Sequence, residues 1–185
     1  MGNVLVWFKR DLRVQDNPAL ALAATREEAV LPLFIVEPEG WAQPDASARQ
    51  WRFVAETLAG LRADLPGLAV RMGDAVDVLS HLCAAHSVSE IIAHEETGNL
   101  WSYARDRRVH AWARASGIRF TEVPQMGVVR RLKGRDGWAK MRDGVMRQPL
   151  VDTPALRLLS VEPGGIPEAR ALGLAFDPCP QRQKG

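Results

Sequence analysis

Charged side chains cluster directly after the first apolar run of the chain. The run 4–8 is apolar throughout, and four of the next five residues are charged: Lys9, Arg10, Asp11 and Arg13. Neighbouring lysine and arginine side chains suit a phosphate group or another polyanion. Lys9 and Arg10 could equally be solvated or contact another domain, so both interpretations stay open.

Acidic side chains occupy comparable positions later in the chain. Glu37 follows the apolar run 29–36, and Glu95 and Glu96 follow the run 90–94. In open α/β sheets, ligands bind outside the carboxyl ends of the strands. The candidates for one ligand pocket are therefore Phe8, Lys9, Arg10, Glu37, Glu95 and Glu96. Trp41, just beyond Glu37, is interpreted as filling a hydrophobic gap, with lining of the pocket as the alternative.

The elements that must position these loops alternate between strands and helices. Apolar runs predict strands at 4–8, 29–36, 68–72, 90–94 and 118–123. Helical patterns predict helices from Pro18 onward and at 47–65, 75–86 and 100–116. Such connections imply right-handed crossovers between parallel strands. We therefore expect an α/β fold: a Rossmann-like five-stranded parallel sheet with helices on both faces, followed by an extended C-terminal connector.

Four individual residues carry local predictions. Asn17 fits the N-cap of the first helix, and Pro18 fits its first turn. Pro32 lies inside the second predicted strand and therefore favours an edge strand or a bulge. His81 and His86 have no metal-ligand companion at useful spacing, so both are expected at the surface or at a helix end, and no metal site is expected.

The bulk properties bound the class of protein. The chain has 185 residues, of which 46% are hydrophobic and 25% charged, as in one soluble globular domain. Cys83 and Cys179 form no close pair, which favours reduced thiols and a cytoplasmic location. No segment approaches the length of a membrane span.

The net charge is only +2, but residues 101–150 hold 12 Lys/Arg against 4 Asp/Glu. We expect at most weak, salt-sensitive DNA association from this region.

The first stretch also carries a specific pattern. Trp7-Phe8-Lys9-Arg10-Asp11-Leu12-Arg13, followed after two residues by Asp16-Asn17-Pro18-Ala19-Leu20, closely resembles the opening of the DNA photolyase/cryptochrome family. The resemblance covers roughly residues 3–147 and includes the segment Tyr103-Ala104-Arg105-Asp106. A stand-alone nucleotide-binding α/β module is the alternative, and the absence of Gly-x-Gly-x-x-Gly and of a phosphate-binding loop motif counts against it.

This resemblance implies two parts in the chain. Residues 1–147 would be a photolyase-type N-terminal α/β domain, and residues 148–185 a proline-rich connector towards a missing helical domain that holds FAD. The intact protein would be a deoxyribodipyrimidine photolyase-like flavoprotein, a carbon–carbon lyase that repairs UV-induced pyrimidine dimers in damaged DNA by light-driven electron transfer. A cryptochrome-type blue-light signalling protein is the alternative. No membrane partner is expected, and the fragment alone is not expected to be active.

The resemblance also implies a light-harvesting, or antenna, chromophore in the α/β domain: a reduced folate, a deazaflavin or a flavin mononucleotide. The six candidate pocket residues named above are assigned to it. Folate-binding members carry Asn-Glu where Trp101-Ser102 stand here, so folate is disfavoured, and a flavin-type antenna or none stays open. Because the family's electron-transfer tryptophans belong to the helical domain, all six tryptophans here are predicted to pack or to line the pocket, and no catalytic residue is predicted.

Overall fold

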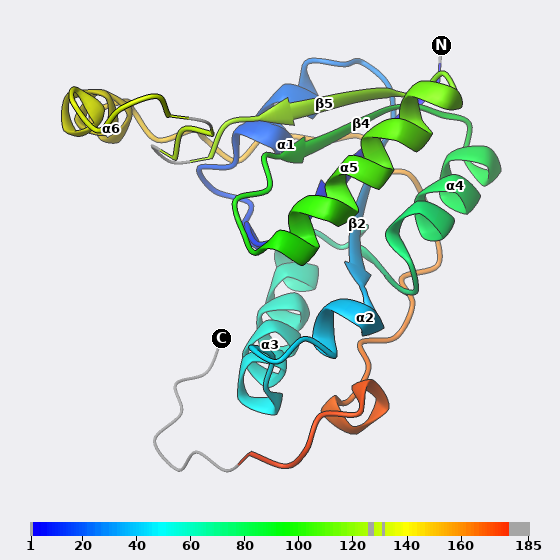
Figure 1. Cartoon of the computed structure of the whole chain (residues 1–185). Coiled ribbons are helices and arrows are strands. Elements are labelled where there is room, and N and C mark those ends of the chain that lie inside the picture. Colours follow the sequence, from blue (N-terminus) through cyan, green and yellow to red (C-terminus); the bar gives the residue numbers. More distant parts are fainter. Residues whose placement is uncertain (1, 126–127, 131, 178–185) are drawn as a thin grey trace.

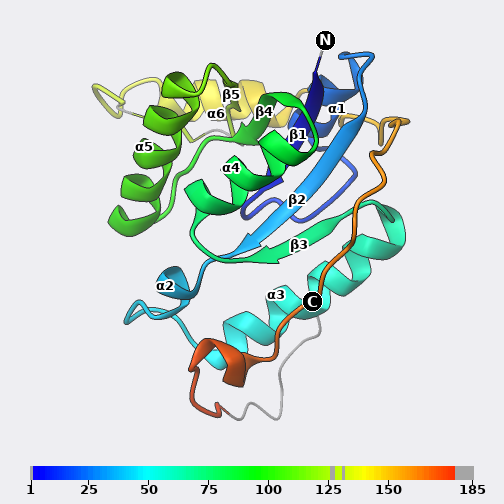
Figure 2. The same cartoon turned by 90° about the vertical axis from the view of Figure 1, so that its right-hand side faces the viewer.

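A five-stranded parallel sheet forms the centre of the molecule (Figures 1 and 2). The structure, a computed structural model, describes residues 2–125, 128–130 and 132–177. The strands are β1 (Asn3–Phe8), β2 (Val30–Val36), β3 (Ala69–Met72), β4 (Val88–His94) and β5 (Arg119–Val123). Their order is β3-β2-β1-β4-β5, and every pair is parallel. The predicted fold is confirmed, and the strand order reverses direction between β1 and β4.

Helices cover both faces of this sheet. Helices α1 (Pro18–Ala24) and α3 (Ala48–Asp64) pack on one face, whereas α4 (Ala75–Ala85) and α5 (Leu100–Ala115) pack on the other. Side chains of a strand point alternately to the two faces. In β1, Val4, Val6 and Phe8 accordingly join the core under α1 and α3, while Leu5 and Trp7 join the core under α4 and α5.

Side-chain caps fix where the helices begin. The Oδ1 atom of Asn17 accepts a hydrogen bond from the Leu20 amide at 3.1 Å, and Pro18 occupies the first turn of α1, as predicted. Ser47, Asp74 and Asn99 cap α3, α4 and α5 in the same way. These caps satisfy amides that have no partner within the helix, and they set the entry of each helix beside the carboxyl end of a strand.

The prediction of an edge or a bulge at Pro32 is wrong. Strand β2 lies inside the sheet, and its register with β1 is regular. The Val30 amide donates to the Arg157 carbonyl of the C-terminal segment at 2.8 Å. The Pro32 nitrogen, two residues further along β2, faces the same side of the strand as the Val30 amide. On that side β3 begins to pair only at Leu33. The proline therefore falls in a gap between the connector and β3, where its missing N–H costs no ladder bond.

The C-terminal segment wraps the domain as far as the structure describes it. It pairs with Val30 through Leu158, and the Pro163 carbonyl accepts the Val70 amide at 2.7 Å. The indole nitrogen of Trp51 donates to Pro167 at 2.9 Å, beside the 3-10 helix η1 (Ala169–Leu172). Cys179 lies outside the described residues. The boundary between 147 and 148 stays a prediction.

Two short helices lie outside the layered body. Helix α2 (Pro38–Trp41) follows β2, and helix α6 (Trp138–Met146) lies beyond the carboxyl end of β5 (Figure 1). No residue of α6 is buried, and Trp138 is 40% exposed. Among the described residues, no helix combines the length and apolarity that crossing a bilayer requires.

Candidate ligand-binding site

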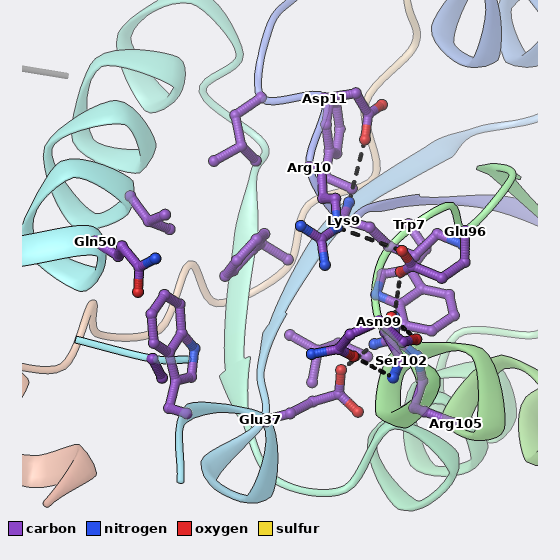
Figure 3. Close-up of a pocket in the computed structure, with 18 of the residues that line it drawn as sticks. Trp7, Lys9, Arg10, Asp11, Glu37, Gln50, Glu96, Asn99, Ser102 and Arg105 are labelled. Atoms are coloured by element: carbon purple, nitrogen blue, oxygen red, sulfur yellow. Dashed lines mark hydrogen bonds and ion pairs between the residues drawn. The ribbon is translucent and has the colours of Figure 1, made fainter. Parts of the chain in front are cut away.

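A cavity of about 620 Å³ opens at the carboxyl ends of the central strands (Figure 3). This volume lies within the usual range of small-molecule pockets. One side of the cavity is apolar or aromatic and is lined by Phe34, Trp41, Phe53, Val54 and Trp101. The other side is charged and is lined by Lys9, Arg10, Asp11, Glu37, Glu96 and Arg105. The site can therefore hold a ligand that is itself partly aromatic and partly polar.

Five of the six predicted pocket residues line this cavity. Phe8, Lys9 and Arg10 come from the end of β1, Glu37 from the end of β2 and Glu96 from the loop after β4. Glu95 does not line the cavity. Its carboxylate lies 3.9 Å from the Arg130 guanidinium instead. Because the side chains of neighbouring residues in an extended chain point to opposite sides, only one of the two glutamates can face the cavity.

Arg105 is the centre of the charged wall, and sequence reasoning missed it as a pocket residue. It is buried on α5 and donates from Nη1 to Glu37 and from Nη2 to Glu96 at 2.8 Å. Its Nε donates to Asp106 at 2.7 Å, and the guanidinium lies 4.7 Å from the ring centroid of Trp7. The available signal was its position one helical turn after Ser102 at the start of α5.

The structure assigns different environments to Lys9 and Arg10. Lys9 is buried, and its Nζ lies 2.7 Å from Asp106 and 5.1 Å from the ring centroid of Trp7. The Arg10 side chain is 58% exposed and contacts Glu96 at 3.3 Å. A Cβ at position 98 would collide with the Arg10 guanidinium, so Gly98 allows this close approach. Arg10, rather than Lys9, is the cation at the rim that can reach a ligand.

Glu37 carries the one polar atom of a buried side chain that has no hydrogen-bond partner in the described part of the chain. Its Oε2 accepts from Arg105, whereas Oε1 is buried without a partner. Burial raises the pKa of Glu37 to about 7, against the opposing pull of the Arg105 guanidinium. Buried polar atoms are nearly always satisfied, so Oε1 marks a place for a ligand donor.

Glu96 has the opposite protonation behaviour. Burial opposes its ionisation, but Lys9, Arg10 and Arg105 outweigh that effect and lower its pKa. The Gly98 amide also donates to its Oε1 at 2.7 Å. Glu96 is therefore a fixed anion that orients Arg10 and Arg105, and Glu37 is the acid of this wall whose charge changes near neutral pH.

Aromatic rings build the opposite wall. Trp41 packs edge-on against Trp51, with ring centroids 5.0 Å apart, and it also lines the cavity, so both interpretations of this residue apply. Trp101, on α5, also lines the cavity, and its ring centroid lies 5.7 Å from the Arg105 guanidinium. Its ring approaches so closely to Gly40 that a Cβ there would lie 2.8 Å away. The Asn99 amide donates to Asp45 at 3.2 Å and ties the loop after α2 to the start of α5.

A buried acid–histidine pair fixes the loop between β1 and α1. The His94 Nδ1 lies 2.5 Å from the Asp11 Oδ2, and both side chains are buried. The His94 contact lowers the pKa of Asp11 despite burial. Oδ1 of Asp11 accepts the Lys9 amide at 3.2 Å, and Asn17 donates to Oδ2 at 3.4 Å. Asp11 therefore sets the backbone that carries Lys9 and Arg10.

The cavity lies where the strand order reverses, which is the usual position of the ligand site in an open, doubly wound α/β domain. Residues 4–132 match the DNA photolyase family. The chain belongs to this family, as its resemblance predicted.

Several relatives are similar to parts of this chain. It is 38% identical over 100 residues to the deoxyribodipyrimidine photo-lyase of Escherichia coli, and this match covers 49% of this chain and 21% of the relative. It is 34% identical over 133 residues to the (6-4)DNA photolyase of Oryza sativa, and this match covers 62% of this chain and 24% of the relative. It is 33% identical over 106 residues to the chloroplastic/mitochondrial cryptochrome DASH of Solanum lycopersicum, covering 52% and 18%. The matches thus span a quarter or less of each of these relatives.

Solved structures share the fold. A bacterial class III photolyase from Agrobacterium tumefaciens superposes with a TM-score of 0.74 at 21% identity, covering 96% of this chain and 39% of the relative. An archaeal photolyase from Sulfolobus tokodaii, solved with two FAD molecules, superposes with a TM-score of 0.69 at 23% identity, covering 84% and 38%. The chain therefore corresponds to one α/β domain of such proteins.

Proposed function

We propose that the intact protein repairs pyrimidine dimers in DNA by light-driven electron transfer from FAD, and that residues 1–147 form its antenna domain. Photolyases from Escherichia coli and Oryza sativa are among its relatives, which supports repair. FAD is assigned to a helical domain beyond this chain, because the strand-end loops here offer no glycine-rich cradle for a pyrophosphate. Cryptochrome-type signalling is the second candidate, since cryptochromes match at similar identity.

The observation that carries the antenna proposal is the unpartnered Oε1 of Glu37, which lies in a cavity with an aromatic wall. A planar heterocycle with a ring N–H fits this arrangement. The N–H would donate to Glu37, and the ring would pack against the tryptophans that line the cavity, since aromatic faces prefer stacked or edge-on contacts. The exposed Arg10 would bind a phosphate at the rim. Figure 3 shows Glu37, Arg10 and Arg105 around the same cavity.

These residues favour a flavin-type chromophore over a folate. Trp101 and Ser102 stand where folate-binding members carry Asn-Glu, and Ser102 is buried in the cap of α5. The Sulfolobus tokodaii relative is described with two FAD molecules and the implication of a novel light-harvesting cofactor, which supports a flavin here too. When bound, such a chromophore absorbs light and passes its excitation energy to FAD. The chain's own residues would bind it, orient its ring and exclude water.

The test is an action spectrum of dimer repair by the full-length protein. The wild type should repair dimers at wavelengths absorbed by FAD and, more efficiently, in a further band that belongs to the antenna. Glu37→Gln should lose that band and keep the repair driven through FAD alone. No repair at any wavelength would contradict the enzymatic assignment and favour signalling. Repair with identical spectra for both proteins would contradict the antenna assignment.

A further inference from the structure

A second cleft, of about 370 Å³, lies on the outer side of α5. It is lined by α5, by β5 at the edge of the sheet and by Arg130 from the segment that follows β5. Its charged and titratable lining residues include Asp106, Arg107, His110, Arg114, Glu122 and Arg130. It is separate from the antenna cavity, whose charged wall is built by Arg105 and the strand ends.

The negative charge in this cleft is already neutralised. Both carboxylate oxygens of Glu122 accept from Arg130, at 2.8 and 2.9 Å, and Oε2 also lies 3.0 Å from the His110 ring. Arg130 and His110 lower the pKa of Glu122 against the effect of burial. Asp106, at the floor, is bound by Lys9 and Arg105. No acid in the cleft is left to attract a cation.

Two arginines of the cleft have no such partner. Arg107 and Arg114 are exposed and form no ion pair with any residue that the structure describes. They are seven residues apart, which places them on one helix face about 10.5 Å apart along the axis. By contrast, the neighbouring Arg108 pairs with Asp74 at 2.9 Å, although it is equally exposed. The charge of Arg107 and Arg114 is therefore available to a ligand.

Further basic side chains follow the cleft in the sequence. The segment from 132 to 147 carries exposed Lys133, Arg135, Lys140 and Arg147, and α6 lies beyond the carboxyl end of β5 (Figure 1). Within the cleft itself, two guanidinium groups about 10.5 Å apart along the helix axis exceed what a single phosphate needs and match an extended polyanion. Guanidinium groups bind phosphate oxygens with two parallel hydrogen bonds, which favours a phosphate backbone over the carboxylates of an acidic peptide.

We propose that the outer face of α5 binds the sugar–phosphate backbone of nucleic acid through Arg107 and Arg114. Arginine recognises a base only where it reaches the edge of that base in a DNA groove. The cleft contains no Asn or Gln, the side chains that pair with adenine. The contact is therefore independent of sequence and sensitive to salt. It assigns a role to part of the basic stretch 101–150 that the antenna function does not use.

The test is fluorescence anisotropy of a short labelled DNA duplex titrated with the 185-residue chain at several salt concentrations. The slope of log affinity against log salt is negative, and each lost phosphate contact reduces its steepness by about 0.9. The double variant R107Q/R114Q should therefore reduce the steepness of the slope by about 2. Arg108→Gln removes the same kind of charge from the same helix and should leave the wild-type slope unchanged. Circular dichroism checks that each variant is folded.

Three results would overturn the proposal. The double variant could keep the wild-type slope, which would remove Arg107 and Arg114 from the contact. Arg108→Gln alone could reduce the steepness of the slope as much as the double variant does, which would make the effect one of net charge. Poly-glutamate could displace the duplex at equal charge concentration, which would reassign the surface to an acidic protein partner.

Discussion

Asn17 is the residue whose removal should cost α1 the most. Asn17→Ala deletes the cap of the Leu20 amide, which alone is worth about 1 kcal/mol. The side chain also donates to the Arg13 carbonyl at 2.9 Å and to Asp11 at 3.4 Å, and it is fully buried. Leaving a buried acceptor unpaired costs about 1–3 kcal/mol. We therefore expect Asn17→Ala to lower the free energy of unfolding by about 2–4 kcal/mol, measured by urea denaturation.

Ser47→Ala is the matched control, because Ser47 caps α3 through one long bond of 3.3 Å to the Gln50 amide. Its side chain is only partly buried and holds no second segment. It should cost about 0.5–1 kcal/mol. Equal losses in the two variants would refute the reasoning, since they would show that the bonds of Asn17 to the 9–13 loop contribute nothing.

Three further perturbations have defined outcomes. Because the pKa of Glu37 rises from 4.5 to about 7 on folding, the folded state holds that proton more tightly, and stability should fall as pH rises through this window. Glu37→Gln should flatten that fall in urea midpoints measured across the range. Gly98→Ala should destabilise the domain by about 1–3 kcal/mol, because a Cβ meets the buried Glu96 carboxylate and Ser102 hydroxyl. Gly60→Ala on α3 meets open space and should stabilise the domain in a thermal melt. Cys83 is buried, and burial raises the pKa of its thiol to about 12, so peptide-resolved mass spectrometry should find it unalkylated at pH 8 while the domain is folded.

The sequence predicted the sheet because the strand signal is local. Continuous apolar runs such as that of β1 and the cap at Asn17 are properties of a few neighbouring residues, and the structure confirms them. Pro32 shows the limit of such reasoning. Whether its missing N–H matters depends on where β3 begins to pair, and that is decided by a segment more than thirty residues away.

The sequence identified some of the residues that line the cavity and missed others. The strand-end rule identified Phe8, Lys9, Arg10, Glu37 and Glu96 as cavity residues, since it needs only the strand positions. Glu95 does not line this cavity, because the rule does not say which way each side chain of a loop points.

Arg105 was missed for a different reason. A mid-helix arginine usually faces solvent, and only the packing of α5 against the strand ends buries it. Its contact to Glu37 joins positions that are 68 residues apart in sequence, which no local pattern indicates, whereas Glu96 is nine residues away.

The central claim is that Glu37 anchors an aromatic chromophore in the strand-end cavity. The most direct measurement is titration of the 185-residue chain with flavin mononucleotide, a deazaflavin and a reduced folate, followed by tryptophan fluorescence at several pH values. Glu95→Gln provides the control, because it makes the same chemical change outside the cavity. We predict that each chain binds one flavin-type chromophore and that its affinity increases as pH rises through about 7. Glu37→Gln should bind it about tenfold or more weakly, and Glu95→Gln should bind it with the affinity of the wild type. Binding that is equal in both variants and independent of pH, or no binding of any of the three compounds, would contradict the account.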